Sequence, residues 1–282
     1  MARLSTTSRA ARSATRSRPM LAPRLLVTAL FVFGMSGATG ALAAPPSNPF
    51  AIAPFSLDVT IPLDHRCMGV LPTKSQRIVD PLQLHGLVVW GAEQPIVFCA
   101  VDWCEIRNGA YDQMRATVAT AAGTVPEAVL LSALHQHDAP VVDTTAGELL
   151  AAQGLADELY QAEFFADVLT RLDQAVRDAC QSPQTFTHVG IGQAEVVDIA
   201  SNRRVVEPDG SISFRRGSRS GSDPQLAEAD RGLIDPWLRT LSFWDGDRPL
   251  AAIHSYATHP MSYYGAGEVS YDFVGIARER RR

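Results

Sequence analysis

Two histidines separated by one residue form the sharpest chemical feature of the sequence. His135 and His137 follow the apolar run over residues 128–134 and precede Asp138. Because side chains alternate along a strand, we expect both imidazoles to leave the strand end on the same face. Two such imidazoles can share a metal ion, or one can bind the ion while the other moves protons. A pair of hydrogen-bonded histidines at a strand end is the alternative, since a single His-x-His motif is weak.

A second histidine pair lies near the end of the sequence, at His254 and His259. His254 falls inside an apolar run, so we expect its side chain to pack in the core or to contact a metal ligand without binding the metal itself. His259 follows that run and precedes Pro260, which restrains the backbone of His259 to an extended conformation. A rigidly held imidazole suits a metal ligand.

Other polar residues stand where apolar runs end. Asp102 ends the run over residues 95–101, and Arg203 and Arg204 follow the strand-like run that ends at residue 200. Catalytic groups of α/β folds collect where strands give way to loops. A guanidinium in such a place could bind a carboxylate or a developing oxyanion. A solvated basic turn is the alternative for the two arginines.

The elements expected to position these residues alternate between strands and helices. Strand-like runs over residues 84–90, 95–101 and 128–134 enclose a helix-like pattern over 105–122 that Gly123 should stop. A long amphipathic helix over 157–180, strands over 188–200, 238–244 and 250–256, a hairpin around residues 208–210 and a helix from about Asp272 follow. This order predicts an α/β fold, a mixed β-sheet core flanked by helices.

The beginning of the chain is basic and free of acidic residues. Six arginines precede a small apolar run that ends at residue 43 in Ala-Leu-Ala. This arrangement is typical of a secretory signal peptide, so we expect cleavage after residue 43, with a retained membrane anchor as the alternative. A proline-rich linker over 44–54 then leads to a domain over 55–282, and the product is exported, to the periplasm or out of the cell.

Cleavage makes the chain more acidic. Removing six arginines and no carboxylate changes the formal net charge from −5 to −11. Such a charge repels phosphates and argues against a nucleic acid partner.

Four cysteines lie beyond the expected cleavage point: Cys67, Cys99, Cys104 and Cys180. An oxidising compartment would allow two disulfides in any of three pairings. A buried free thiol is the alternative for Cys99, which lies in an apolar run.

The order of these motifs resembles the neutral, non-lysosomal ceramidase family, amidases that use zinc. The family pattern Ala-Thr-His-Thr-His-Ser-Gly-Pro resembles residues 133–140, its Asn-Arg-Ser turn resembles 202–204, and its His-Pro-Thr-Ser turn is similar to 259–262. Its Ile-Asp-Pro stretch, Leu-Ser-Phe strand and Ser-x-Asp-x-x-Gly helix start resemble residues 234–236, 241–243 and 270–275, and its early Asp-Ile-Thr resembles 58–60. The resemblance covers nearly all of residues 55–279.

The resemblance implies a function and a role for each matching residue. His135 and His259 would bind Zn²⁺, His137 would assist proton transfer, and Arg203 would hold the substrate or the oxyanion. The implied activity is hydrolysis of the N-acyl amide bond of ceramide-like lipids, a lipid-like substrate that brings the protein into transient contact with a membrane surface. The alternatives are an exported non-catalytic domain that binds metal or only packs, and a zinc hydrolase acting on another amide or ester.

The sequence departs from the family pattern in two places. Gln136 and Asp138 replace a threonine and a serine, and Asp138 adds a carboxylate that could orient an imidazole or cost specificity. The family also completes its zinc shell with a glutamate and a tyrosine far downstream of the final helix, beyond Arg282. We therefore expect an N-terminal catalytic domain that is incomplete at the C-terminus and binds zinc weakly. Neighbouring candidates that match no family ligand position are Tyr263, Tyr264 and Glu268.

Overall fold

A five-stranded sheet forms the centre of the fold, in the order β6-β4-β3-β1-β8. Its strands are β1 (Ala51–Asp58), β3 (Gln83–Trp90), β4 (Ile96–Val101), β6 (Val129–Ala133) and β8 (Gln184–Thr185). The pair β4 and β6 is parallel, whereas the other neighbours are antiparallel. The mixed sheet predicted from the order of the sequence patterns is confirmed.

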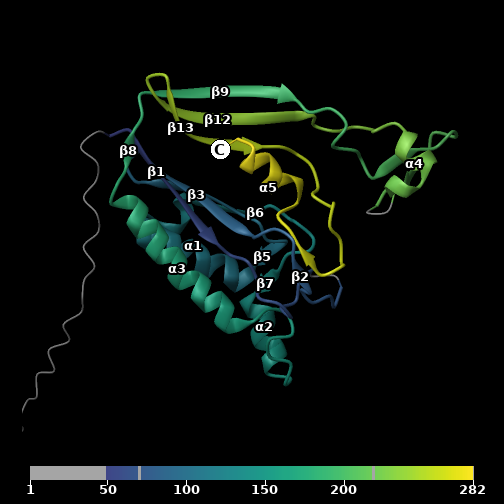
Figure 1. Ribbon diagram of the computed structural model, residues 1–282, viewed down its shortest axis with the longest axis horizontal. Helices are drawn as coiled ribbons and strands as arrows, with labels where there is room; N and C mark the ends of the chain where they lie inside the picture. The colour runs from purple at the N-terminus through teal and green to yellow at the C-terminus, as the bar shows by residue number, and fades with distance from the viewer. Residues whose placement is uncertain (1–48, 69–70, 218–219, 282) are drawn as a thin grey trace, which may run out of the picture. The chain divides into compact units, whose positions relative to one another are not determined.

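Helices cover one face of this sheet and a second sheet covers the other (Figure 1). The helices are α1 (Asn108–Ala122) and α3 (Ala162–Cys180), which pack on each other. The second sheet is antiparallel, in the order β13-β12-β9, and consists of β9 (His188–Glu195), β12 (Trp237–Asp245) and β13 (Arg248–Ser255). The domain is therefore layered as helices, mixed sheet and antiparallel sheet.

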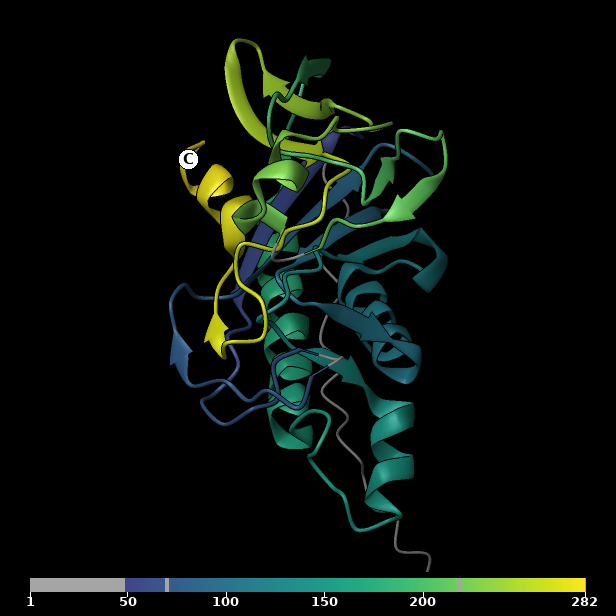
Figure 2. The same ribbon diagram turned by 90° about the vertical axis from the view of Figure 1, so that its right-hand side faces the viewer.

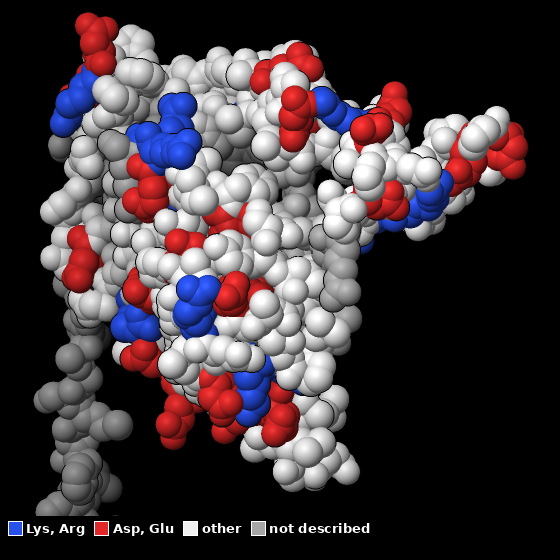
Figure 3. Space-filling view, turned by 45° about the vertical axis from the view of Figure 1, so that its right-hand side comes forward, with Lys and Arg blue, Asp and Glu red and all other residues white. Residues whose placement is uncertain are grey.

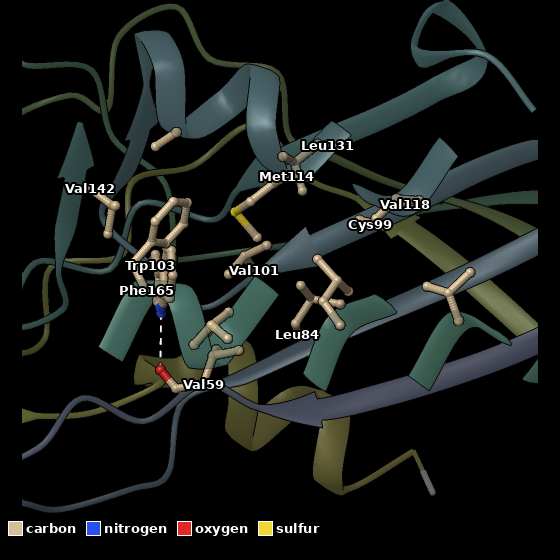
Figure 4. Packing of buried hydrophobic residues seen from close by; sticks show 14 of the residues in the cluster. Val59, Leu84, Cys99, Val101, Trp103, Met114, Val118, Leu131, Val142 and Phe165 are labelled. Atoms are coloured by element: carbon tan, nitrogen blue, oxygen red, sulfur yellow. Dashed lines mark hydrogen bonds between the residues drawn. The ribbon is translucent and has the colours of Figure 1, made fainter. Parts of the chain in front are cut away.

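Alternating side chains of the central sheet fill the two interfaces. In β3, Leu84 and Val88 join the core beneath the helices, and Leu87 joins the smaller cluster beneath the second sheet. This alternation follows from the two-residue repeat of a strand. Figure 4 shows the helix-side core, where the buried Trp103 donates its Nε1–H to the carbonyl of Val59 at 3.0 Å. The largest aromatic of that core thus has its polar atom satisfied.

Shorter elements connect these layers. They are β2 (Arg77–Ile78), β5 (Glu105–Arg107), β7 (Val141–Asp143), β10 (Arg204–Val206), β11 (Ile212–Phe214), β14 (Glu268–Val269), α2 (Thr144–Ala151), α4 (Pro224–Glu228), α5 (Asp272–Glu279) and two 3-10 turns, Pro126–Ala128 and Ser220–Ser222. Figure 2 shows β2 (blue) beside β14 (yellow), a parallel pair from opposite ends of the described chain.

The computed structural model describes residues 49–68, 71–217 and 220–281. The expected signal peptide, 1–43, and the first part of the expected linker lie outside these residues. Ala51, Ile52 and Ala53, which we assigned to the linker over 44–54, are buried residues of β1. The folded core thus begins within that segment, before residue 55. None of the described helices combines the length and the apolar composition that a bilayer crossing requires.

Several element boundaries differ from the sequence expectation. The helix expected from residue 105 begins at Asn108, and residues 105–107 form strand β5 instead. The long helix begins at Ala162 instead of residue 157, because Asp157 has a positive φ of 60° and its carboxylate accepts the amide hydrogen of Ala162 at 3.0 Å. The strand expected over 188–200 ends at Glu195. Gly123, with a φ of 69°, ends α1 as predicted, since glycine adopts this left-handed conformation without strain.

All four cysteines are buried, Cys67, Cys99 and Cys180 are free thiols, and Cys104 Sγ lies 3.8 Å from His135 Nδ1. On the face drawn in Figure 3, acidic and basic side chains are interspersed. Some ion pairs join residues one helical turn apart, as between Arg171 and Asp167 at 2.7 Å.

Candidate metal centre

The first histidine pair lies in a gap between two parallel strand pairs. β4 pairs with β6, and further along the chain β5 pairs with β7 in the same sense. The amide of Leu134 donates to the carbonyl of Val101 at 2.9 Å, and the amide of His135 donates to that of Trp103 at 3.0 Å. These bonds hold the segment that fills the gap at the strand ends, where we expected the site.

The rings of His135 and His137 lie close together, but not because of the strand alternation that the sequence suggested. β6 ends at Ala133, and His135 has a φ of 69°, in the left-handed region that residues with a side chain rarely adopt. Strand alternation therefore does not operate at His135 and His137. Their proximity is nevertheless as predicted, with ring centroids 4.9 Å apart.

His259, far away in the sequence, completes a cluster of three imidazoles. Its ring centroid lies 4.9 Å from that of His135 and 4.5 Å from that of His137. One nitrogen from each ring lies within 4.8 Å of the others. Nitrogens bound to one tetrahedral zinc at about 2.1 Å stand roughly 3.4 Å apart, so a contraction of up to about 1.4 Å would close the group around an ion.

Backbone carbonyls determine the tautomers of two of the rings. His135 Nδ1 lies 2.8 Å from the carbonyl of Cys104, and His137 Nδ1 lies 3.0 Å from that of Pro260. A carbonyl can only accept, so each Nδ1 carries the hydrogen and each Nε2 keeps a free lone pair. Metal-binding histidines are commonly oriented in this way, which fits the group to a metal that prefers imidazole.

His259 has a different partner. Arg203 Nη2 lies 2.7 Å from His259 Nδ1, and because a guanidinium only donates, this nitrogen accepts. Arg203 occupies a turn in which Asn202 Oδ1 accepts the amide hydrogen of Arg204 at 3.0 Å and Asn202 Nδ2 donates to the carbonyl of Leu233 at 2.8 Å. The neighbouring Arg204 lies over a phenylalanine ring instead. Of the two arginines, Arg203 is thus the one that reaches the cluster.

The cluster favours neutral imidazoles. Burial lowers the pKa of His137 below its usual value, and burial, reinforced by His137 and Arg203, lowers the pKa of His259 to about 4. A protonated imidazole has no lone pair for a metal. At neutral pH both rings are therefore neutral, and each keeps one nitrogen with a lone pair.

The additional carboxylate, Asp138, accepts hydrogen bonds from the backbone of a loop. It is fully buried and accepts the amide hydrogens of Gly265, Ala266 and Glu268 at 2.5, 3.0 and 3.3 Å. The loop so held carries Tyr264, whose ring stacks on His137 with a centroid distance of 5.0 Å. Asp138 thus secures one wall of the site.

Two further sequence candidates lie elsewhere. Within the described ranges, the potential metal-binding group consists of three histidines and does not include Glu268, which pairs with Arg77 at 2.6 Å. His254 is exposed on β13 and its Nδ1 lies 2.8 Å from Thr240 Oγ1, so the expected core or supporting position is wrong. The backbone carbonyls that orient the rings could not be identified from the sequence, because every residue carries a carbonyl.

The protein belongs to a class of layered α/β domains with a candidate metal centre. Its layers are helices, a mixed sheet and an antiparallel sheet, and three histidines lie at the strand ends.

Among solved structures, the chain is similar to a neutral ceramidase from Pseudomonas aeruginosa, with a TM-score of 0.58 and 20% identity over 79% of this chain and 34% of that chain. It is also similar to a ceramidase complexed with C2, with a TM-score of 0.55 and 18% identity over 79% of this chain and 33% of that chain.

The similarity is one of fold. No sequence model of a known family matches the chain, and no curated protein sequence matches it either. The ceramidase-type fold implied by the motifs is confirmed, and the chain spans about a third of the length of these two structures.

Proposed function

We propose that the chain carries part of the active site of an exported, zinc-dependent hydrolase that cleaves the N-acyl amide bond of ceramide-like lipids. The observation that carries the proposal is the meeting of His135, His137 and His259 in a fold shared with ceramidases. Its lipid-like substrate implies transient contact with a membrane surface.

The donor set supports zinc as the ion. Three imidazole nitrogens suit zinc, whereas calcium and magnesium prefer oxygen ligands. His135 and His259 are the proposed ligands. Zinc bound there would polarise the amide carbonyl and lower the pKa of a bound water towards ~7.

The side chains around the ion have separate tasks. His137, neutral and held through its Nδ1–H by the carbonyl of Pro260, would accept a proton from the attacking water at Nε2 and deliver it to the leaving amine nitrogen. Arg203, exposed at the edge of the cluster, would donate to the carbonyl oxygen as negative charge develops there. Tyr264, stacked on His137, would limit the movement of that ring.

The test combines zinc content with hydrolysis. The full chain, loaded with zinc and freed of excess metal, should retain about one ion and release fatty acid from N-acylsphingosine in detergent micelles. His135→Ala and His259→Ala should each lose both properties. His254→Ala is the matched control, because it removes an exposed histidine outside the cluster. A full-length version that retains zinc without cleaving any amide or ester would exclude the hydrolase.

A non-catalytic metal-binding domain is the second candidate. This candidate is favoured because, among the described residues, the group of three histidines contains no carboxylate that could complete the coordination of the metal. This reading predicts that zinc raises the unfolding temperature while simple esters and N-acyl amides remain intact. Cleavage of simple esters or amides but not of N-acylsphingosine would instead indicate a zinc hydrolase with another substrate.

A further inference from the structure

A buried polar network lies behind the first histidine pair. Its centre is Asp102, which directly follows β4 and is 0% exposed. The Asp102 carboxylate accepts the amide hydrogen of Gln83 at 2.9 Å and a hydrogen from Gln136 Nε2 at 2.9 Å. Arg278 approaches with Nη1 and Nη2, at 3.0 and 2.7 Å. Four donors therefore partly compensate the loss of water around one carboxylate.

Gln136 links this network to the candidate metal centre. It is 1% exposed and stands between His135 and His137, whose rings belong to the cluster. The Gln136 amide donates to Asp102 and also, at 3.3 Å, to the carbonyl of Tyr271 beside α5. The middle residue of the His-x-His segment is thus anchored in the protein while its neighbours face the site.

Arg278 brings α5 into the same network. It comes from the last turn of that helix, with 20% of its side chain exposed, and it lies 176 positions from Asp102 in the sequence. Its guanidinium also lies 5.7 Å from the ring centroid of Tyr271. Removing one partner of a buried ion pair leaves the other charge uncompensated. The helix and the strand end are therefore held together by a contact that tolerates little displacement.

The backbone of the histidine segment needs such an anchor. The left-handed conformation of His135 costs free energy and persists only where the surroundings impose it. We propose that Gln136, Asp102 and Arg278 form a positioning network that fixes His135 and His137 in the geometry required for metal binding. The proposal rests on the proposed function for the identity of the ion, and it holds for the metal-free protein as well.

Gln136→Met tests the network because it keeps the length of the side chain and removes its amide. Hydrogen exchange of the metal-free full chain should become faster by about 10-fold or more at residues 134–138, and zinc affinity should fall by roughly 10–100-fold, as for groups that orient metal ligands. Gln113→Met is the matched control, since it removes a side-chain amide bonded to Thr144 at 3.3 Å, away from the site. It should leave exchange at 134–138 and zinc affinity unchanged.

A second pair of variants covers the case in which Gln136→Met fails to fold. Arg278→Lys keeps the charge but loses the two-nitrogen contact with Asp102, so it should lose less zinc affinity than Arg278→Met, which should lose as much as Gln136→Met. Arg115→Met, which removes a guanidinium bonded to the carbonyl of Val129 at 3.2 Å, is the control.

The outcomes separate the two proposals. Exchange and zinc affinity equal to those of the controls would overturn the positioning network, and so would exchange that rises uniformly across β3 and β4. A parent chain that binds no zinc, combined with faster exchange confined to residues 134–138 in Gln136→Met, would remove the proposed function and leave the positioning network supported.

Discussion

Arg203 Nη2 lies 2.7 Å from His259 Nδ1, and this contact cannot persist when a neutral His259 binds a metal. A metal on Nδ1 takes the lone pair that accepts from Arg203. A metal on Nε2 leaves the hydrogen of the neutral ring on Nδ1, where it opposes the guanidinium. In either case a metal held by His259 would release Arg203, and its donors would then be free for a substrate oxygen.

Because Arg203 and a metal ion compete for His259, Arg203→Met should have opposite effects on zinc binding and on hydrolysis. Zinc affinity should rise by about 3–10-fold, because a charge-assisted hydrogen bond to the ligand is lost. Hydrolysis should fall by about 10²–10³-fold, as when an oxyanion donor is removed. Competition with a fluorescent zinc chelator and fatty acid release measure the two effects. Arg204→Met is the control, since Arg204 lies over Phe214, and unchanged zinc affinity in Arg203→Met would contradict the competition.

His137→Ala separates a proton carrier from a metal ligand. If His137 transfers protons, the variant should keep zinc within a few-fold of the parent affinity and lose about 10²–10⁴-fold in hydrolysis. The geometry makes this a sharp test, because His137 lies as close to His259 as His135 does. Metal analysis after dialysis against a weak chelator gives the answer, and a zinc-free variant would make His137 a ligand.

Asp138→Ala should destabilise the protein while its metal ligands stay intact. Three backbone amides, in a partly buried place, lose the buried carboxylate that accepts their hydrogens, and an unpaired buried group costs about 1–3 kcal/mol, so we expect a loss of about 3 kcal/mol in the free energy of unfolding. Urea denaturation measures this loss. Asp209→Ala is the control, because Asp209 caps an exposed turn at Ser211. Equal midpoints for the two variants would show that Asp138 does not hold the loop.

The buried thiols predict a pH dependence of stability. Burial raises the pKa of Cys99 to about 12, and burial, helped by Asp138, raises the pKa of Cys67 to about 12. Free cysteine has a pKa of about 8.5, so the folded state holds these protons more tightly than the unfolded state. The resulting stability is present below pH ~8.5 and is lost as the pH rises towards 12.

Two measurements check this behaviour. A thiol reagent at pH 8 should label Cys67 and Cys99 slowly in the native protein and rapidly in urea. The unfolding temperature should fall between pH 8 and pH 10.5 and should fall less in Cys99→Ala. Rapid labelling of the native protein at pH 8 would contradict the burial of these thiols.

Local patterns in the sequence determined most of the elements. The end of α1 at Gly123, the strands β3, β4 and β6, and the hairpin of β12 and β13 follow from side-chain periodicity and turn residues, which act over a few positions. The pairing of His135 with His137 was visible for the same reason, although the strand alternation that suggested it gives way to a left-handed turn.

Only the tertiary structure decided how the site is held. Arg278 meets Asp102, and His259 meets His135, across long stretches of chain that no local pattern connects. The rings are oriented by carbonyls of Cys104 and Pro260, a group that every residue carries. The sequence therefore determined which side chains could do the chemistry. Their geometry depends on long-range packing and on backbone hydrogen bonds, which have no sequence signature.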